Sequence, residues 1–141
     1  MRLVVLRLFV CVLALLAYQA VMADSEGADC KVAEATVGWV LACETEPAFE
    51  AAQEKMDISY AAFLSAMTHA SDYDSSMKQR LGEAVRNTQR AWLVFVKADC
   101  ERSGLLAGSG LWRAIAELEC ETAAYNDRAR YYTDEKRALV L

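Results

Sequence analysis

Apolar side chains recur every three or four residues along the sequence from about residue 47 onwards. The first such stripe comprises Phe49, Ala52, Met56, Tyr60, Phe63, Leu64 and Met67. This spacing places the apolar groups on one face of a helix, which we expect from about Pro47 to His69. Proline suits a first helical turn, because its missing N–H has no helical partner there. A shorter helix is expected before it, from about Val32 or Thr36 to Cys43.

Two further stripes of the same period follow. One comprises Met77, Leu81, Ala84, Val85, Thr88, Trp92, Phe95 and Asp99, and the other comprises Leu111, Trp112, Ile115, Leu118, Thr122, Tyr125, Ala129 and Tyr132. The segment Ser71–Asp74 offers a turn and an N-cap for the second helix. Residues Arg102–Gly110 contain three Gly and two Ser, so we expect a substantial loop there, with Ser109 as cap of the third helix. The third helix is expected to end in the basic Lys136–Arg137 region. The pattern predicts an all-α fold, a small antiparallel helical bundle.

Composition supports one folded domain of this class. The chain has 141 residues, of which 55% are hydrophobic and 25% charged, with one Pro, six Gly and a net charge of −5. Too few Pro and Gly are present for a disordered or collagen-like chain. The acidic balance also excludes a protein that tracks the phosphates of nucleic acid.

The first 23 residues have the pattern of a signal peptide. Met1–Arg7 is basic, Leu8–Val21 is apolar, and Val21-Met22-Ala23 fits a cleavage site after Ala23. The apolar run is shorter than the roughly 20 residues that a membrane span needs. We therefore expect a mature domain of residues 24–141 in the periplasm or outside the cell, without a membrane anchor. Loss of two arginines leaves 13 basic and 20 acidic groups, a net charge of −7.

The mature chain retains four cysteines in an oxidising compartment, which indicates two disulfides. Sequence alone allows three pairings; we expect Cys30 with Cys43 and Cys100 with Cys120. A straight helix from 30 to 43 would separate the first pair by nearly 20 Å, at about 1.5 Å per residue. Cys30 must then lie in a non-helical segment that folds back beside a helix beginning near Thr36. No Cys-x-x-Cys spacing accompanies the single histidine, so neither a metal nor a cofactor is expected.

Few residues suggest catalysis. His69 is the only histidine and is expected at the surface. Glu117 and Glu121 lie four residues apart, as do Glu50 and Glu54, and both pairs are expected to be solvated charges. No nucleophile, base and metal can be assembled from these groups, so an enzyme is not expected. The face that carries Glu117 and Glu121 is instead a candidate partner-binding surface.

A denser motif runs from Gln89 to Cys100. It reads Gln-x-x-Trp-Leu-x-Phe-x-x-x-x-Cys, with Gln89, Trp92, Leu93, Phe95 and Cys100 at the fixed positions. Other fixed positions along the mature chain are Cys30, Cys43, Tyr60, Ser109, Cys120 and Arg128. In order and spacing these residues resemble the lysozyme inhibitor LprI-like family of exported bacterial domains. Val96-Lys97 departs from the Arg-Asp that is usual in that family, and Met56-Asp57 departs from its Leu-Asn.

Within the motif we expect Trp92 in the core and Gln89 bonded to buried backbone groups, with Tyr60 and Arg128 on a polar rim. The resemblance implies that the domain binds and inhibits a lysozyme or a related cell-wall hydrolase. An acidic domain would be attracted to a cationic lysozyme, through the expected loop at 102–110 or an acidic helix face. The alternative is an interaction or toxin-immunity module of the envelope with another protein partner. Neither function involves nucleic acid.

Overall fold

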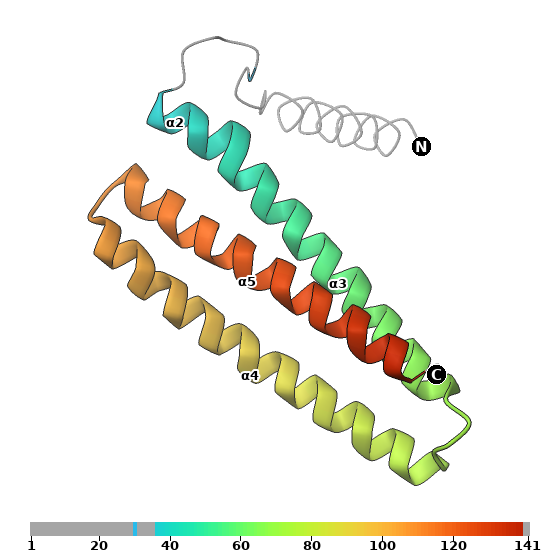
Figure 1. The fold of residues 1–141 in the computed structure, drawn as a ribbon. Coiled ribbons are helices and arrows are strands. Elements are labelled where there is room, and N and C mark those ends of the chain that lie inside the picture. The colour runs from blue at the N-terminus through green and yellow to red at the C-terminus, as the bar shows by residue number, and fades with distance from the viewer. Residues whose placement is uncertain (1–29, 31–35, 140–141) are drawn as a thin grey trace, which may run out of the picture. The chain divides into compact units, whose positions relative to one another are not determined.

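The protein is an all-α domain, as the sequence predicts. The structure, a computed structural model, describes residues 30 and 36–139. Its elements are α2 (Val37–Val40), the π-helix η1 (Leu41–Thr45), α3 (Glu46–His69), α4 (Ser75–Ala107) and α5 (Leu111–Ala138). Helix α5 lies between α3 and α4 and packs on both, whereas α3 and α4 make little contact with each other (Figure 1). Consecutive long helices run in opposite directions, so the expected antiparallel bundle is confirmed.

Several helix ends lie where the sequence predicts them. Helix α3 ends at His69, and α5 ends at Ala138 with Lys136 and Arg137 in its last turn. Asp74 is the N-cap of α4: its carboxylate accepts a hydrogen bond from the backbone N–H of Met77 at 2.8 Å. This bond satisfies one of the helix's free N–H groups.

The short helix expected before Pro47 begins next to Thr36, one of the two predicted starts, but its predicted end at Cys43 is wrong. The backbone is helical without a break from α2 through η1 into α3, and the first turn is capped by Thr36, whose hydroxyl accepts from the N–H of Trp39 at 3.2 Å. Pro47 lacks an N–H, and in a regular helix its ring would clash with the carbonyl of Cys43. The wider π turn at Leu41–Thr45 lies just before the proline and keeps the chain helical there.

The long loop expected at Arg102–Gly110 is also wrong. Helix α4 continues to Ala107, and the turn has only Gly108 and Gly110, with φ of 112° and 66°, and the residue between them. Gly104 lies inside the helix because Glu117 of α5 packs onto it, and a Cβ at this position would collide with the Glu117 side chain. Ser109 does not cap α5, whose N-cap is Gly110 without a side-chain hydrogen bond.

The core lies between α3 and α5, which run in the same direction. Its buried cluster consists of Met56, Phe63 and Met67 from α3 with Ala129 and Tyr132 from α5. On α4 the buried face differs from the predicted one and consists of Gly82, Gln89, Val96, Cys100 and Gly104. Phe95, which the pattern places on the apolar stripe, is 64% exposed.

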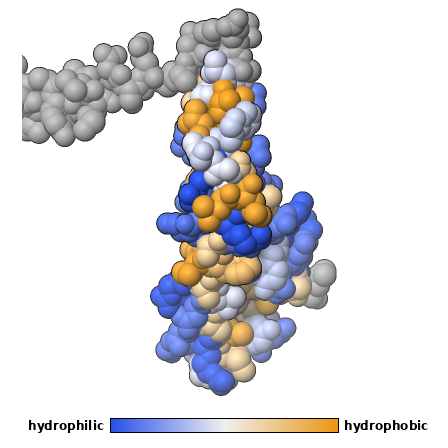
Figure 2. Space-filling view, turned by 90° about the vertical axis from the view of Figure 1, so that its left-hand side faces the viewer, coloured by the Kyte–Doolittle hydropathy of each residue, from blue (hydrophilic) through white to orange (hydrophobic). Residues whose placement is uncertain are grey.

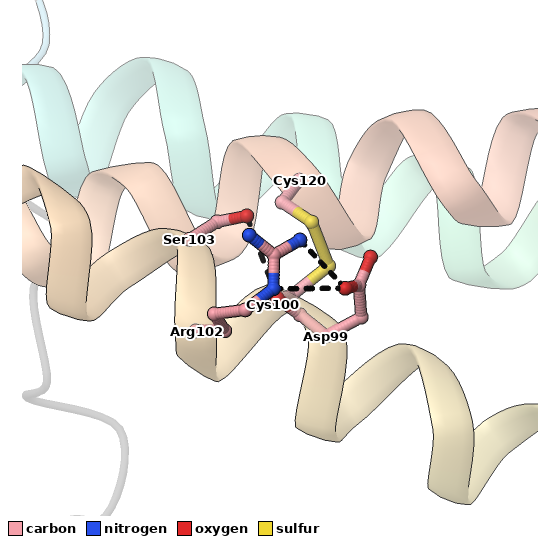
Figure 3. Close-up of polar contacts among 5 residues, drawn as sticks. All are labelled: Asp99, Cys100, Arg102, Ser103 and Cys120. Atoms are coloured by element: carbon pink, nitrogen blue, oxygen red, sulfur yellow. Dashed lines mark hydrogen bonds and ion pairs between the residues drawn. A yellow bond between two sulfur atoms is a disulfide. The ribbon is translucent and has the colours of Figure 1, made fainter.

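A disulfide ties α4 to α5. Cys100 and Cys120 are joined with an S–S distance of 2.04 Å and a Cα–Cα distance of 5.4 Å (Figure 3). Beside it, Arg102 donates to the Asp99 carboxylate at 2.7 Å. Cys30 and Cys43 are disulfide-bonded as well, so the two expected bridges are present. The expected signal peptide, residues 1–23, lies outside the described residues.

Candidate functional site

Gln89 is the centre of a buried polar junction that links all three long helices. Only 5% of the residue is exposed. Its Oε1 accepts hydrogen bonds from the Arg128 Nε at 3.1 Å and from the Tyr132 hydroxyl at 2.6 Å, and its Nε2 donates to the Met56 sulfur at 3.1 Å. The expectation that Gln89 satisfies buried backbone groups is therefore wrong, since its partners are side chains of α3 and α5.

Arg128 lies within an aromatic cluster and not on the expected rim. Its guanidinium carbon is 5.2 Å from the ring centroid of Trp92 and 4.8 Å from those of Tyr131 and Tyr132. These are cation–π distances, and the bond to Gln89 holds the guanidinium in place. Trp92 was expected in the core, but it is only half-buried, so this prediction is confirmed only in part.

Tyr60 was expected on a polar rim, but it packs against the buried core cluster. It is half-buried, and its ring centroid lies 5.1 Å from that of Tyr132. Burial raises the pKa of Tyr132, against the nearby positive charge of Arg128. Tyr132 thus stays protonated and able to donate to Gln89 at any physiological pH.

A groove of about 340 Å³ opens beside this cluster, between α4 and α5. Trp92, Phe95 and Arg128 of the sequence motif converge on it, together with the Cys100–Cys120 bridge, Asp99, Asp127 and Tyr131. Each of the two carboxylates pairs with an arginine three residues further along its own helix. Sequence reasoning did not single out Tyr131, although its position three residues after Arg128 places both on one helix face.

Glu117 and Glu121 are not the solvated pair expected. The Arg113 Nε donates to Glu117 at 2.6 Å, and the Glu117 side chain, 30% exposed, packs onto Gly104. Glu121 is half-buried, and this burial is the main cause that raises the pKa of its carboxyl group. The positive charge of Lys97 lowers the pKa, and the negative charge of Glu117 raises it further. Reversing the charge of Glu117 would therefore disturb the contact between α4 and α5.

His69 lies on the surface, as predicted. It is exposed, and its Nδ1 is 2.7 Å from the backbone carbonyl oxygen of Ser65. In the part of the chain that the structure describes, no three His, Cys, Asp or Glu side chains gather where they could hold a metal ion.

The end of the molecule where α4 meets α5 exposes apolar groups. Leu105, Leu106, Leu111 and Trp112 are 57%, 78%, 47% and 58% exposed. Figure 2 shows the side of the molecule on which this connection lies, where apolar patches (orange) lie among hydrophilic surface (blue). Leu111 and Trp112 were expected to begin the apolar stripe of the third helix, but both are exposed.

Comparison with known proteins identifies the family. No curated protein and no solved structure matches the chain. Across residues 36–139, no helix has both the length and the apolar character that a membrane crossing needs. A family model described as "Lysozyme inhibitor LprI" matches residues 28–131, which is most of the sequence and includes every residue of the polar junction except Tyr132. The chain therefore belongs to the lysozyme inhibitor LprI family.

Proposed function

We propose that this chain is an exported inhibitor that binds a lysozyme or a related cell-wall hydrolase and has no catalytic activity of its own. The observation that carries the proposal is the family match over residues 28–131. The acidic balance of the chain, −5 in total and −7 after loss of residues 1–23, supports it. Such a charge would steer the domain toward a cationic enzyme and speed their association.

Two surfaces support binding of a protein partner. The turn between α4 and α5 exposes Trp112 and three leucines, and aromatic side chains of this kind commonly anchor interfaces. The acidic face with Glu117 and Glu121 remains a second proposed contact, although both side chains also have intramolecular neighbours. Export by a cleaved signal peptide is part of the same proposal.

The test is a lysozyme turnover assay with the exported, disulfide-bonded protein. Added in increasing amounts to a cationic lysozyme acting on a cell-wall suspension, it should lower the rate until the enzyme is saturated. The dissociation constant, measured by biolayer interferometry, should rise between 0.1 and 1 M salt, because the Debye length falls from about 10 to about 3 Å.

Unchanged turnover at a large molar excess of the protein would contradict lysozyme inhibition. The same assay with other wall hydrolases then decides whether a related enzyme is the target. If none is inhibited, recovery of a toxin or another envelope protein as a stoichiometric partner would favour the interaction or immunity module instead.

A further inference from the structure

A slot of about 290 Å³ lies where η1 and the first turn of α3 pack against α5. Its apolar walls are Val40, Ala48 and Ala123, and Glu44 and Glu119 lie among the residues that line it. Both glutamates are exposed. An apolar passage bordered by carboxylates fits a side chain with a long aliphatic stem and a positively charged end.

The negative charge at this slot is not neutralised within residues 36–139. Neither Glu44 nor Glu119 has a basic group of the described residues within ion-pair distance, whereas Asp99, Glu101 and Glu117 each pair with an arginine. Among the residues that the structure describes, no Lys, Arg or His lines the slot.

Thr122, one of the residues that line the slot, has a buried polar atom that makes no hydrogen bond within the described part of the chain. The Oγ1 of Thr122 is shielded from solvent and makes no hydrogen bond. Such a group loses its bond to water on folding and gains none in return, which is uncommon in native proteins.

The backbone around the slot is irregular at the same place. The slot is lined by Glu44 and Thr45 of η1, and isolated π turns within α-helices occur frequently at functional sites.

We propose that this slot receives a lysine or arginine side chain of a cationic protein partner. The aliphatic stem lies against Val40, Ala48 and Ala123, and the charged end is held by Glu44 and Glu119. The inference rests on the proposed function, because it names a surface through which the domain holds a cationic wall hydrolase.

The first test compares two pairs of charge-neutralising substitutions. The slot variant is Glu44→Gln with Glu119→Gln, and the control is Glu50→Gln with Glu54→Gln, two exposed glutamates on α3 that do not line the slot. Both variants lose two negative charges. We expect the dissociation constant for a cationic lysozyme to rise about tenfold or more in the slot variant and less than about threefold in the control. An equal rise of the dissociation constant in both variants would show that only the net charge matters, and it would contradict the proposed slot.

A third variant fills the slot without changing its charge. Ala123 is exposed at the slot wall, so Ala123→Leu is expected to fold normally, which a thermal melt followed by circular dichroism checks. Its affinity for the lysozyme should fall about as far as that of the slot variant. Full affinity in a folded Ala123→Leu protein would contradict the proposal.

A tetralysine peptide tests the slot separately from the enzyme. Added to the 15N-labelled protein, it should shift the amide resonances of Thr45 and Thr122 in the wild type and not in the slot variant. Absence of these shifts would overturn the slot even if lysozyme were inhibited. Shifts at the slot without inhibition of any wall hydrolase would support the slot and contradict the proposed function.

Discussion

Gln89 shows how one residue can hold three helices together. A single amide side chain serves as acceptor for Arg128 and Tyr132 and as donor to Met56. In Gln89→Leu the Tyr132 hydroxyl and the Arg128 Nε lose their partner in a nearly dry environment. Leaving such groups unpaired costs about 1–3 kcal/mol, so we expect the free energy of unfolding to fall by about 2–3 kcal/mol in urea denaturation.

The matched control is Gln79→Leu, on an exposed part of α4. The Gln79 side chain donates a hydrogen bond to Glu83, four residues along the same helix, at 3.0 Å. The change should stay within about 0.5 kcal/mol, as for most surface substitutions. Equal stabilities of the two variants would show that the junction contributes nothing.

Gly104 provides a second prediction at the residue scale. In Gly104→Ala the new methyl group displaces the Glu117 side chain and breaks its bond to Arg113. Overpacking of this kind typically costs about 1–3 kcal/mol, measurable as a lower denaturation midpoint. Adding Glu117→Ala should restore most of the loss, because it removes the atoms that collide.

Gly82→Ala, on the same helix, is the control: it measures the effect of replacing a helical glycine where no close packing opposes the new methyl group. A Cβ at Gly82 would meet only the mobile end of Arg86, at 3.3 Å. This variant should gain up to about 1 kcal/mol from helix propensity. A gain of the same size in Gly104→Ala would contradict the close packing of Glu117.

At the element scale, periodicity predicted the three long helices and most of their ends. It failed where packing overrides local preference. Glycine and serine near residue 104 read as a loop, but Gly104 is helical because another helix touches it. Pro47 was predicted to begin a helix, and it does lie in the first turn of α3; what the pattern did not predict is the π turn that makes the segment before it helical as well. The contact of Gly104 with Glu117 joins two helices, so local sequence preference does not predict it.

The bridge between α4 and α5 allows a prediction about these two elements. Replacing Cys100 and Cys120 together by serine frees a loop with a sequence separation of 20. Because the bridge restricts the unfolded chain, its loss should lower the free energy of unfolding by about 3 kcal/mol, with helical content retained in circular dichroism before the transition. A stability equal to that of the wild type would show that helix packing alone sets the contact.

At the scale of the whole molecule, the motif includes residues that the structure brings together, but it did not predict how they meet. Gln89 and Arg128 were assigned separate roles, because sequence spacing gives no distance between α4 and α5. The slot at Glu44 and Glu119 was missed entirely for the same reason: its walls come from two helices far apart in the chain. Pattern and composition thus predicted an all-α fold. The polar junction and the slot form only when α5 packs on α3 and α4, which the pattern does not describe.

The last prediction concerns the form in which the molecule exists. Cleavage after Ala23 should give an exported protein that begins at Asp24, because the basic and apolar segments are followed by Val21-Met22-Ala23. Intact mass spectrometry of the exported protein checks this. Ala23→Phe, which places a large side chain where signal peptidase needs a small one, should leave residues 1–23 attached. If the wild type retains them too, the acidic domain would work at a membrane surface instead of diffusing to its partner.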